Sequence, residues 1–310
     1  MKTKSKFIGL LAMALVGAGM FSACLRAAET NPRSSADRDS YNLAVRLDVA
    51  KGELAGTLVL DYRNNGINPL DEIRLRLDPN LNRSFKMEID SIQDATGQPF
   101  PWRFVRLAFG ALSSERGQVA IQLPKPLPTG ETIRLNLAFR ESGPFIGNEM
   151  TTLQDDPYHS FDAWYPKAMT RIDNDWSIDD DRPSDFTVAV TLPANHTVAS
   201  TGVPAGEQPS SGGDKTLRLR AEGVRGFTIY ASSAWKKFHA TAGDIDLEVC
   251  LPSEAEKWAT PILETMASVI RFYEQHYGQF PSRHLAMICP GDLTGRLTGA
   301  PRPATSLRSG

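Results

Sequence analysis

The sequence predicts a mainly β protein, in which a large antiparallel β domain is followed by a short α/β segment. Two observations carry this prediction. Residues 41–243 alternate between apolar and polar in segment after segment, which is the period of a strand with one buried and one solvated face. After residue 243 a run with helical spacing replaces the alternation. We therefore expect two packed or curved antiparallel sheets over residues 41–243, and a strand, a helix and a further strand over 244–291.

Turn residues divide the alternating region into strands. The alternation is clearest in residues 43–49, 73–77, 133–139 and 186–192. Glycine, asparagine and proline, which favour turns, stand between such segments. Examples are Lys51-Gly52-Glu53, Asn64-Asn65-Gly66, Pro128-Thr129-Gly130 and the Ser/Gly-rich residues 209–214.

A single long helix is predicted from Ser253 to Gly278. Ser253 and Glu256 have the spacing of a capping box. Gly278 is expected to form a left-handed C-cap, and Pro281 prevents continuation. One apolar face is expected from Trp258, Ile262, Met266, Val269, Ile270 and Tyr273. Because a helix and one strand cannot bury a core of their own, we expect them to rest on the β domain.

The composition indicates a folded protein without a nucleic-acid partner. Of 310 residues, 41% are hydrophobic and 23% charged, and the net charge is only -2. This charge provides no field that attracts nucleic acid, and no RNA-binding signature is present. Residues 292–310 are small and polar, and we expect a disordered or frame-shifted tail there.

The N-terminus has the layout of an export signal. Lys2, Lys4 and Lys6 precede an apolar run over residues 7–21, which is shorter than the roughly 20 residues of a transmembrane helix. The following Ser22-Ala23-Cys24 resembles a bacterial lipobox, so residues 1–24 are expected to be a lipoprotein signal, with Cys24 lipidated and 25–40 a linker. The alternative is an ordinary signal cleaved near residues 26–28. Either signal places the mature protein in the periplasm or at the cell surface.

Two cysteines follow Cys24. Cys250 and Cys289 both end apolar strand segments. Buried free thiols are one interpretation, and a disulfide, which export permits, is the other. There is no Cys-x-x-Cys pair to indicate zinc or redox chemistry.

Several motifs, in this order, resemble the M1 family of zinc aminopeptidases over about residues 41–290. They are the hairpin at 41–64, Leu77-Asp78-Pro79-Asn80, Trp164-Tyr165-Pro166-Lys167, residues 186–204, residues 226–232 and Tyr277-Gly278-Gln279-Phe280-Pro281. The resemblance implies a saddle-like β-sandwich domain of M1 type at 41–243. Residues 244–291 would be the beginning of a thermolysin-like catalytic domain.

The family would use zinc, held by two histidines and a glutamate, to cleave peptides. That chemistry requires a His-Glu-x-x-His helix. The five histidines of this chain are His159, His196, His239, His276 and His284. None is followed by glutamate and no two are four residues apart, so we expect no catalytic residue, no metal ligand and no zinc in this chain.

Two further sets of polar residues have competing interpretations. The family holds the substrate amine with a Gln or Glu from an N-domain loop. Gln154 lies near that place, although a surface-loop glutamine is the alternative.

A calcium loop is suggested by the alternating polar residues Asp173, Asp175, Ser177, Asp179 and Asp181. Ile178 and Ser184 stand where that loop needs Gly and Glu, which favours a solvated acidic turn.

The sequence thus predicts the N-terminal portion of an exported M1-like metallopeptidase that is inactive alone, with peptide as the substrate the family implies. The alternative is a non-catalytic surface lipoprotein whose β domain binds a partner. A third hypothesis is that a separate chain supplies the zinc domain. No serine-hydrolase elbow, P-loop or dinucleotide fingerprint points to another enzyme class.

Overall fold

The computed structural model describes residues 37–49, 51–81, 85–109, 112–143, 158–161, 164–172, 175–177 and 182–288, with backbone alone for Phe109 and residues 158–161. Strands dominate, and the described part of the chain has a single α-helix, so the predicted fold class is confirmed. No helix in these ranges has the length and hydropathy to cross a membrane. Cys24, the predicted signal and residues 292–310 lie outside them.

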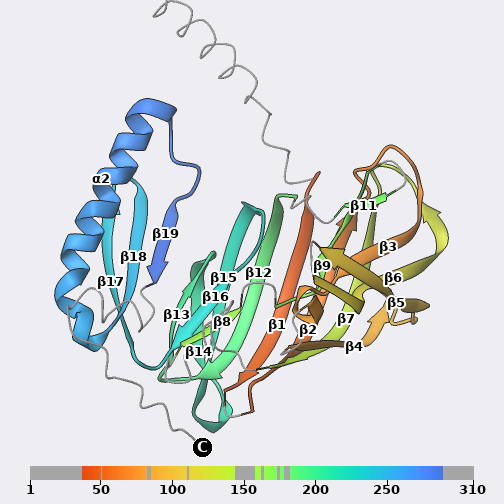
Figure 1. Ribbon diagram of the computed structural model, residues 1–310, viewed down its shortest axis with the longest axis horizontal. Helices are drawn as coiled ribbons and strands as arrows, with labels where there is room; N and C mark the ends of the chain where they lie inside the picture. Colours follow the sequence, from red (N-terminus) through yellow and green to blue (C-terminus); the bar gives the residue numbers. More distant parts are fainter. Residues whose placement is uncertain are drawn as a thin grey trace, which may run out of the picture. The chain divides into compact units, whose positions relative to one another are not determined.

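The largest sheet has seven strands in the order β14-β15-β12-β1-β2-β7-β4 (Figure 1). These are β1 (Asp39–Asp48), β2 (Glu53–Arg63), β4 (Lys86–Gln93), β7 (Thr132–Ser142), β12 (Ser184–Pro193), β14 (Val203–Pro209) and β15 (Asp214–Val224). All neighbours are antiparallel except β1 and β12, which run parallel with Asp39 opposite Ser184. The expected purely antiparallel arrangement is wrong at this pair. Parallel neighbours need a long crossover, which the strands between β1 and β12 provide.

A four-stranded sheet in the order β5-β6-β3-β9 supplies the second layer. It contains β3 (Leu70–Arg76), β5 (Trp102–Phe109), β6 (Leu112–Leu127) and β9 (Lys167–Ala168). Ile73 and Leu75 of β3 and Val119 and Ile121 of β6 are buried in the same core cluster as the large sheet. The predicted packing of two sheets is therefore confirmed.

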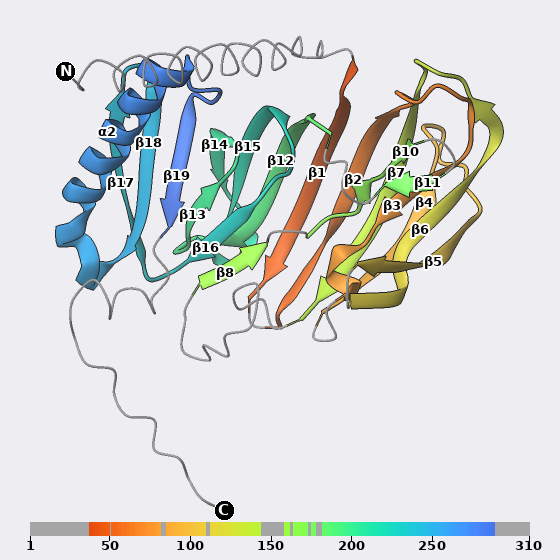
Figure 2. The ribbon, with the colours of Figure 1, turned by 45° about the horizontal axis from the view of Figure 1, so that its top comes forward.

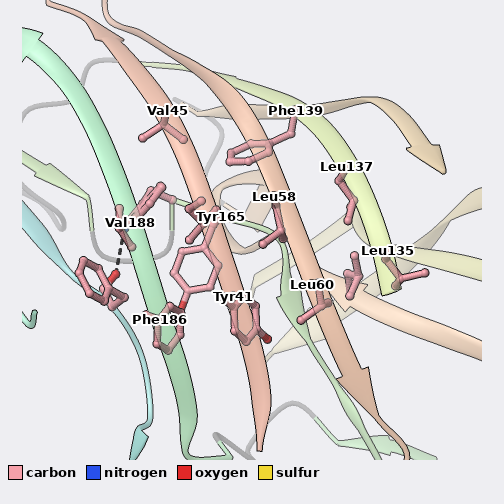
Figure 3. Close-up of a cluster of buried hydrophobic side chains, with 14 of the residues drawn as sticks. Tyr41, Val45, Leu58, Leu60, Leu135, Leu137, Phe139, Tyr165, Phe186 and Val188 are labelled. Atoms are coloured by element: carbon pink, nitrogen blue, oxygen red, sulfur yellow. Dashed lines mark hydrogen bonds between the residues drawn. The ribbon is translucent and has the colours of Figure 1, made fainter. Parts of the chain in front are cut away.

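The core forms because apolar residues recur at every second position. In β1 the side chains of Tyr41, Leu43, Val45 and Leu47 are buried and those between them are exposed. Residues of β2, β7 and β12 join them on the same side of the sheet (Figure 3). Tyr41 stacks on Phe186 with ring centroids 4.7 Å apart, so β1 and β12 are joined by side chains as well as by backbone.

The Trp-Tyr-Pro motif contributes to this core. Trp164 and Tyr165 are buried, and Trp164 Nε1 donates a hydrogen bond to the Phe227 carbonyl oxygen at 2.9 Å. Tyr165 contacts Tyr41 edge-on with centroids 5.5 Å apart. The motif therefore connects the large sheet to the segment before β16.

Several short elements complete the β region. Strands β8 (Tyr158–Phe161), β13 (Thr197–Ser200) and β16 (Ile229–Ser232) form a three-stranded sheet. A hairpin joins β10 (Thr170–Ile172) to β11 (Asp175–Ser177). This region also contains the 3-10 helices η2 (Asp78–Leu81) and η3 (Ser211–Gly213).

The C-terminal sheet contains β17 (Trp235–Ala242), β18 (Ile245–Pro252) and β19 (His284–Ile288), in that order. The helix α2 (Ala259–Tyr277) lies along one face of this sheet and connects β18 to the parallel β19 (Figure 2). The predicted strand, helix and strand are present. These elements also bury a core cluster of their own, contrary to expectation. The reason is β17, a third strand that we expected to belong to the preceding domain.

The predicted capping box is wrong. Residues Ser253–Trp258 form a 3-10 helix, η4, and α2 begins only at Ala259, with no side-chain capping bond at either start. Pro261 explains the delay. An α-helix that began at Ser253 would need a Pro261 N–H to bond the Lys257 carbonyl, whereas proline has no N–H and its ring clashes there. In the observed α2, Pro261 lies in the first turn, where backbone N–H groups have no partner within the helix, so its missing N–H costs nothing. Glu256 instead forms an ion pair with Lys236 at 2.6 Å.

The predicted apolar helix face is only partly right. Met266 and Ile270 are buried against the sheet, as expected, together with the unpredicted Ala259, Leu263 and Ala267. Val269 and Tyr273 are instead 47% and 52% exposed. The packing face is therefore rotated towards Ala259, Leu263 and Ala267.

Gly278 ends the helix with φ 94° and ψ -176°, and its N–H donates to the Glu274 carbonyl. The positive φ favours glycine, as predicted, although ψ lies far from the left-handed helical value.

Candidate functional site

The face of the C-terminal sheet opposite α2 carries charged side chains. Leu247, Val249 and Leu251 of β18 pack in the helix-side cluster. Because strand side chains alternate, the residues between them point away from the helix. With their neighbours on β17 and β19 they form what we call the polar face: Lys237, His239, Asp246, Glu248, Cys250 and His284.

Lys237 and Glu248 form the most buried ion pair of the polar face. Lys237 Nζ lies 2.8 Å from Glu248 Oε2, and the glutamate side chain is 2% exposed. The Cys250 thiol lies 3.7 Å from the other carboxylate oxygen. Burial, followed by the charge of Glu248, raises the pKa of Cys250 to about 12. The thiol is therefore held protonated, and it is not a nucleophile at neutral pH.

Two histidines of the polar face share one carboxylate. His284 Nδ1 lies 3.3 Å from Asp246 Oδ2, and His239 Nδ1 lies 3.9 Å from Asp246 Oδ1. The parallel register sets His284 directly opposite Asp246. His284 is buried, whereas His239 is about half exposed. His284 is within hydrogen-bonding distance of this carboxylate, whereas His239 lies only at ion-pair distance from it.

A cavity of about 380 Å³ lies between the polar face and strands β13 to β15. Its charged lining residues are Lys215, Lys237, Glu207, Glu248 and His284, and Thr197 and Ser200 supply hydroxyl groups. We call this the polar pocket. Its mixed charges and hydroxyls suit a small polar ligand, because they offer both donors and acceptors.

A second cavity, of about 690 Å³, lies between α2 and the β19 side of the same sheet. Its lining includes Val269, Tyr273 and Tyr277 of the helix and Leu285 and Met287 of β19, and no charged residue. We call this the apolar groove. It offers mainly apolar surface, with Thr265, Gln279 and the tyrosine hydroxyls as its polar groups.

Three solved structures that match this chain are of M1 zinc metallopeptidases. A Deinococcus radiodurans M1 zinc metallopeptidase bound to a Tyr-Ser-Ala substrate matches with a TM-score of 0.58 and 19% identity over 81% of this chain. A two-domain M1 zinc metallopeptidase bound to L-tryptophan matches with a TM-score of 0.59 and 20% identity. This chain has the M1 metallopeptidase fold.

A further M1 zinc metallopeptidase structure from the same organism matches with a TM-score of 0.55 and 20% identity. The chain spans 56% of the length of each of these three structures and is itself covered to 81% in each comparison. No protein-family model and no curated protein matches the sequence.

The structure places the histidines apart from one another, except for the pair on Asp246. His196 is buried with Nδ1 3.0 Å from Asn195 Oδ1. His276 is in the last turn of α2, where Nδ1 lies 2.7 Å from the Phe272 carbonyl oxygen. The His159 side chain lies outside the described residues. Within the described ranges, no group of three or more His, Cys, Asp or Glu residues could hold a metal ion.

Other predicted site residues lie largely outside the described residues, among them Gln154, Asp173, Asp179, Asp181 and Cys289. Asp175 and Ser177 are the two ends of β11, and Asp175 is exposed. Cys250 is a buried free thiol.

Sequence reasoning missed Lys237, Asp246 and Glu248. A signal was available for Glu248, because it interrupts an apolar strand that ends in Cys250. Such a strand is expected to be buried on both faces, and a charge within it needs a partner.

Proposed function

We propose that this chain is the N-terminal portion of an exported M1-like metallopeptidase, and that it does not hydrolyse peptides alone. Residues 41–243 would form the β domain and 244–291 the beginning of the catalytic domain. The observation that carries this proposal is that 81% of this chain has the M1 fold. The matched part accounts for 56% of the length of the solved structure. The Tyr-Ser-Ala substrate of one matched structure supports peptides as the substrate class.

The residues of this chain do not fit a catalytic zinc ion. The sequence contains no His-Glu-x-x-His, which supplies two ligands and the general base from one helix. The described residues that come closest to a set of zinc ligands are His239 and His284 on the polar face. Both direct Nδ1 at Asp246. A metal bound there would have to displace these contacts. No hydrolytic step is therefore assigned to this chain.

Export and lipid anchoring at Cys24 complete the proposal. They are supported by the lysines, the apolar run and the small residues before Cys24. Metabolic labelling with a fatty-acid analogue tests the anchor. We expect the full chain to be labelled and the Cys24→Ala variant to be unlabelled.

The decisive experiment measures zinc content and activity of the purified full chain. We expect neither stoichiometric zinc nor cleavage of amino-acid anilides. Clear hydrolysis, or one zinc ion per chain, would show that the chain is not inactive alone. Reading the genomic DNA beyond the codon for Gly291 in all three frames tests the family assignment separately, because the proposal expects a downstream His-Glu-x-x-His.

The second candidate is a non-catalytic surface lipoprotein that binds a partner. The polar pocket favours it, because it is complete within this chain and requires no zinc. A downstream zinc motif in the genome would eliminate this candidate. If no such motif lies in any frame, the binding protein replaces the peptidase portion.

A further inference from the structure

Two lysine–glutamate pairs supply the fixed charges of the polar pocket. Lys237 Nζ lies 2.8 Å from Glu248 Oε2, and Lys215 Nζ lies 3.5 Å from Glu207 Oε2. All four residues line the cavity, and the two lysine side chains are only 27% and 17% exposed. Their charges cancel. A ligand without net charge is therefore favoured, because a net charge brought into a partly buried neutral site loses hydration that nothing there offsets.

The two lysines have hydrogen-bond donors to spare. A lysine ammonium group carries three N–H donors. Lys237 uses one of them on Glu248, and Lys215 makes only the longer contact with Glu207. The remaining donors have no partner among the described residues. Since ammonium groups bind carboxylates through short, charge-assisted hydrogen bonds, these lysines suit a ligand carboxylate.

The hydroxyl groups of β13 offer acceptors instead. Thr197 Oγ1 donates its hydrogen to the Trp235 carbonyl oxygen at 2.9 Å, and Ser200 Oγ donates to the Gly202 carbonyl oxygen at 2.8 Å. Because a hydroxyl group has a single hydrogen, both oxygens can only accept a hydrogen bond from a ligand. The Glu207 carboxylate, whose side chain is 54% exposed, is a further acceptor. This set suits a ligand ammonium group.

Apolar side chains line the same cavity. Leu217 and Leu219 alternate along β15 with the same period as Lys215, so all three point to one face of the sheet, and Val198 of β13 joins them. The volume of about 380 Å³ lies in the range of small-molecule sites. The ligand should therefore have an apolar body as well as its charged groups.

His284 adds a buried nitrogen that lacks a partner. Its side chain is 4% exposed and lines the pocket, and Nδ1 faces Asp246. Nε2 forms no hydrogen bond with the described residues, whereas buried polar atoms normally have a partner. His284 is the first residue of β19, and the other lining residues lie within 197–248. The described chain thus continues beyond every wall of this cavity.

We propose that the polar pocket binds a small zwitterion, a molecule with one ammonium and one carboxylate group on an apolar body. Lys215 and Lys237 hold the carboxylate, and Thr197, Ser200 and Glu207 hold the ammonium group. Zwitterion binding is independent of a zinc domain, so the two proposals can fail separately. Calorimetry decides the first, and zinc content with anilide cleavage decides the peptidase proposal.

Isothermal titration calorimetry of the full chain with L-leucine is the test. We expect one site per chain. The two matched half-molecules are 4-methylpentanoate, which lacks the amine, and 3-methylbutylamine, which lacks the carboxylate. Each should bind roughly tenfold or more weakly than L-leucine, because charged hydrogen-bond partners in the pocket are left unpaired. No saturable binding of L-leucine, or binding of either half-molecule as tight as that of L-leucine, overturns the proposal.

A pair of lysine variants locates the site. Lys215→Met keeps the aliphatic stem and leaves only the half-exposed Glu207 without its cation, and it should weaken L-leucine binding roughly tenfold or more. Lys125→Met removes the same charge at an exposed position of β6 outside the pocket and should leave the affinity unchanged. An unchanged affinity in Lys215→Met, or equal losses in both variants, overturns the proposal. Comparing the half-molecules on the parent chain requires no variant, so the proposal stays testable if Lys215→Met fails to fold.

Discussion

Lys237 on β17 reaches diagonally to Glu248 on β18, with 2.8 Å between Nζ and Oε2. The register sets Lys237 opposite Cys250 and His239 opposite Glu248. The Lys237–Glu248 ion pair therefore links two successive cross-strand pairs on the same face of the sheet. Glu248 is almost fully buried, whereas about a quarter of Lys237 reaches solvent. The lysine therefore neutralises a carboxylate that has little access to water.

Lys237→Met should destabilise the protein by about 3 kcal/mol, because it leaves Glu248 charged, buried and without its cation. Urea denaturation of the full chain, followed by circular dichroism, measures this. The control is the double variant Lys237→Met with Glu248→Leu, which removes both charges. It should recover most of the loss, and equal losses in the single and double variants would contradict the explanation.

Glu141 predicts a dependence of stability on pH. It continues the buried row of Leu135, Leu137 and Phe139 in β7, and its Oε2 has no hydrogen-bond partner in the described part of the chain. Burial raises the pKa of Glu141 from its ordinary value of 4.5 to about 8. The folded protein therefore keeps a proton that the unfolded chain loses. This contribution to stability is full below about pH 4.5 and is lost as pH rises towards 8.

Glu141→Gln removes this titration. Compared with the parent, the variant should gain roughly 3 kcal/mol of relative stability between pH 5 and pH 8, since each pH unit is worth about 1.4 kcal/mol. Urea midpoints at several pH values measure the gain. Glu131→Gln, at an exposed position just before the same strand, is the control and should parallel the parent. Parallel curves for Glu141→Gln as well would contradict a neutral buried carboxyl group.

The strands could be predicted because their signal is local, whereas their partners could not. Alternation in residues 39–48 and 184–193 identifies β1 and β12 separately, but their parallel pairing depends on the path of the chain between them. The helix shows a related limit. The spacing of bulky apolar residues placed Met266 and Val269 on one buried face, whereas Met266 is buried and Val269 is 47% exposed.

The candidate site was missed for the same reason. Lys237 and Glu248 are eleven positions apart, and only the β17–β18 register brings them together. Glu248 lies within an apolar strand, but the sequence does not show which residue pairs with its carboxylate. The burial of both strand faces comes from contacts with α2 on one side and with β13 on the other.

Gly202 should not tolerate a side chain. A Cβ atom there would lie 2.7 Å from two ring carbons of Phe227 and 2.9 Å from the Arg220 carbonyl oxygen. Phe227 is fixed in the core, so the clash cannot be relieved by a flexible side chain. We expect Gly202→Ala to cost about 2 to 3 kcal/mol, measured as a shift of the urea midpoint. Gly226→Ala is the control, since its Cβ would meet nothing closer than 3.7 Å, and a similar loss there would contradict the steric explanation.

The state of Cys250 can be decided by thiol labelling. The structure gives a buried free thiol whose pKa burial raises to about 12, while an unfolded cysteine titrates near 8.5. Iodoacetamide at pH 8 should therefore leave Cys250 unmodified in the folded chain and alkylate it once urea is added, without any reductant. Mass spectrometry of the peptide that contains Cys250 measures both results.

Alkylation of Cys250 in the folded state would contradict its burial. A requirement for reductant in urea would instead establish the disulfide that the sequence left open. Burial and the negative charge of Glu248 both oppose the Cys250 thiolate, which is the reactive form in alkylation and in disulfide exchange.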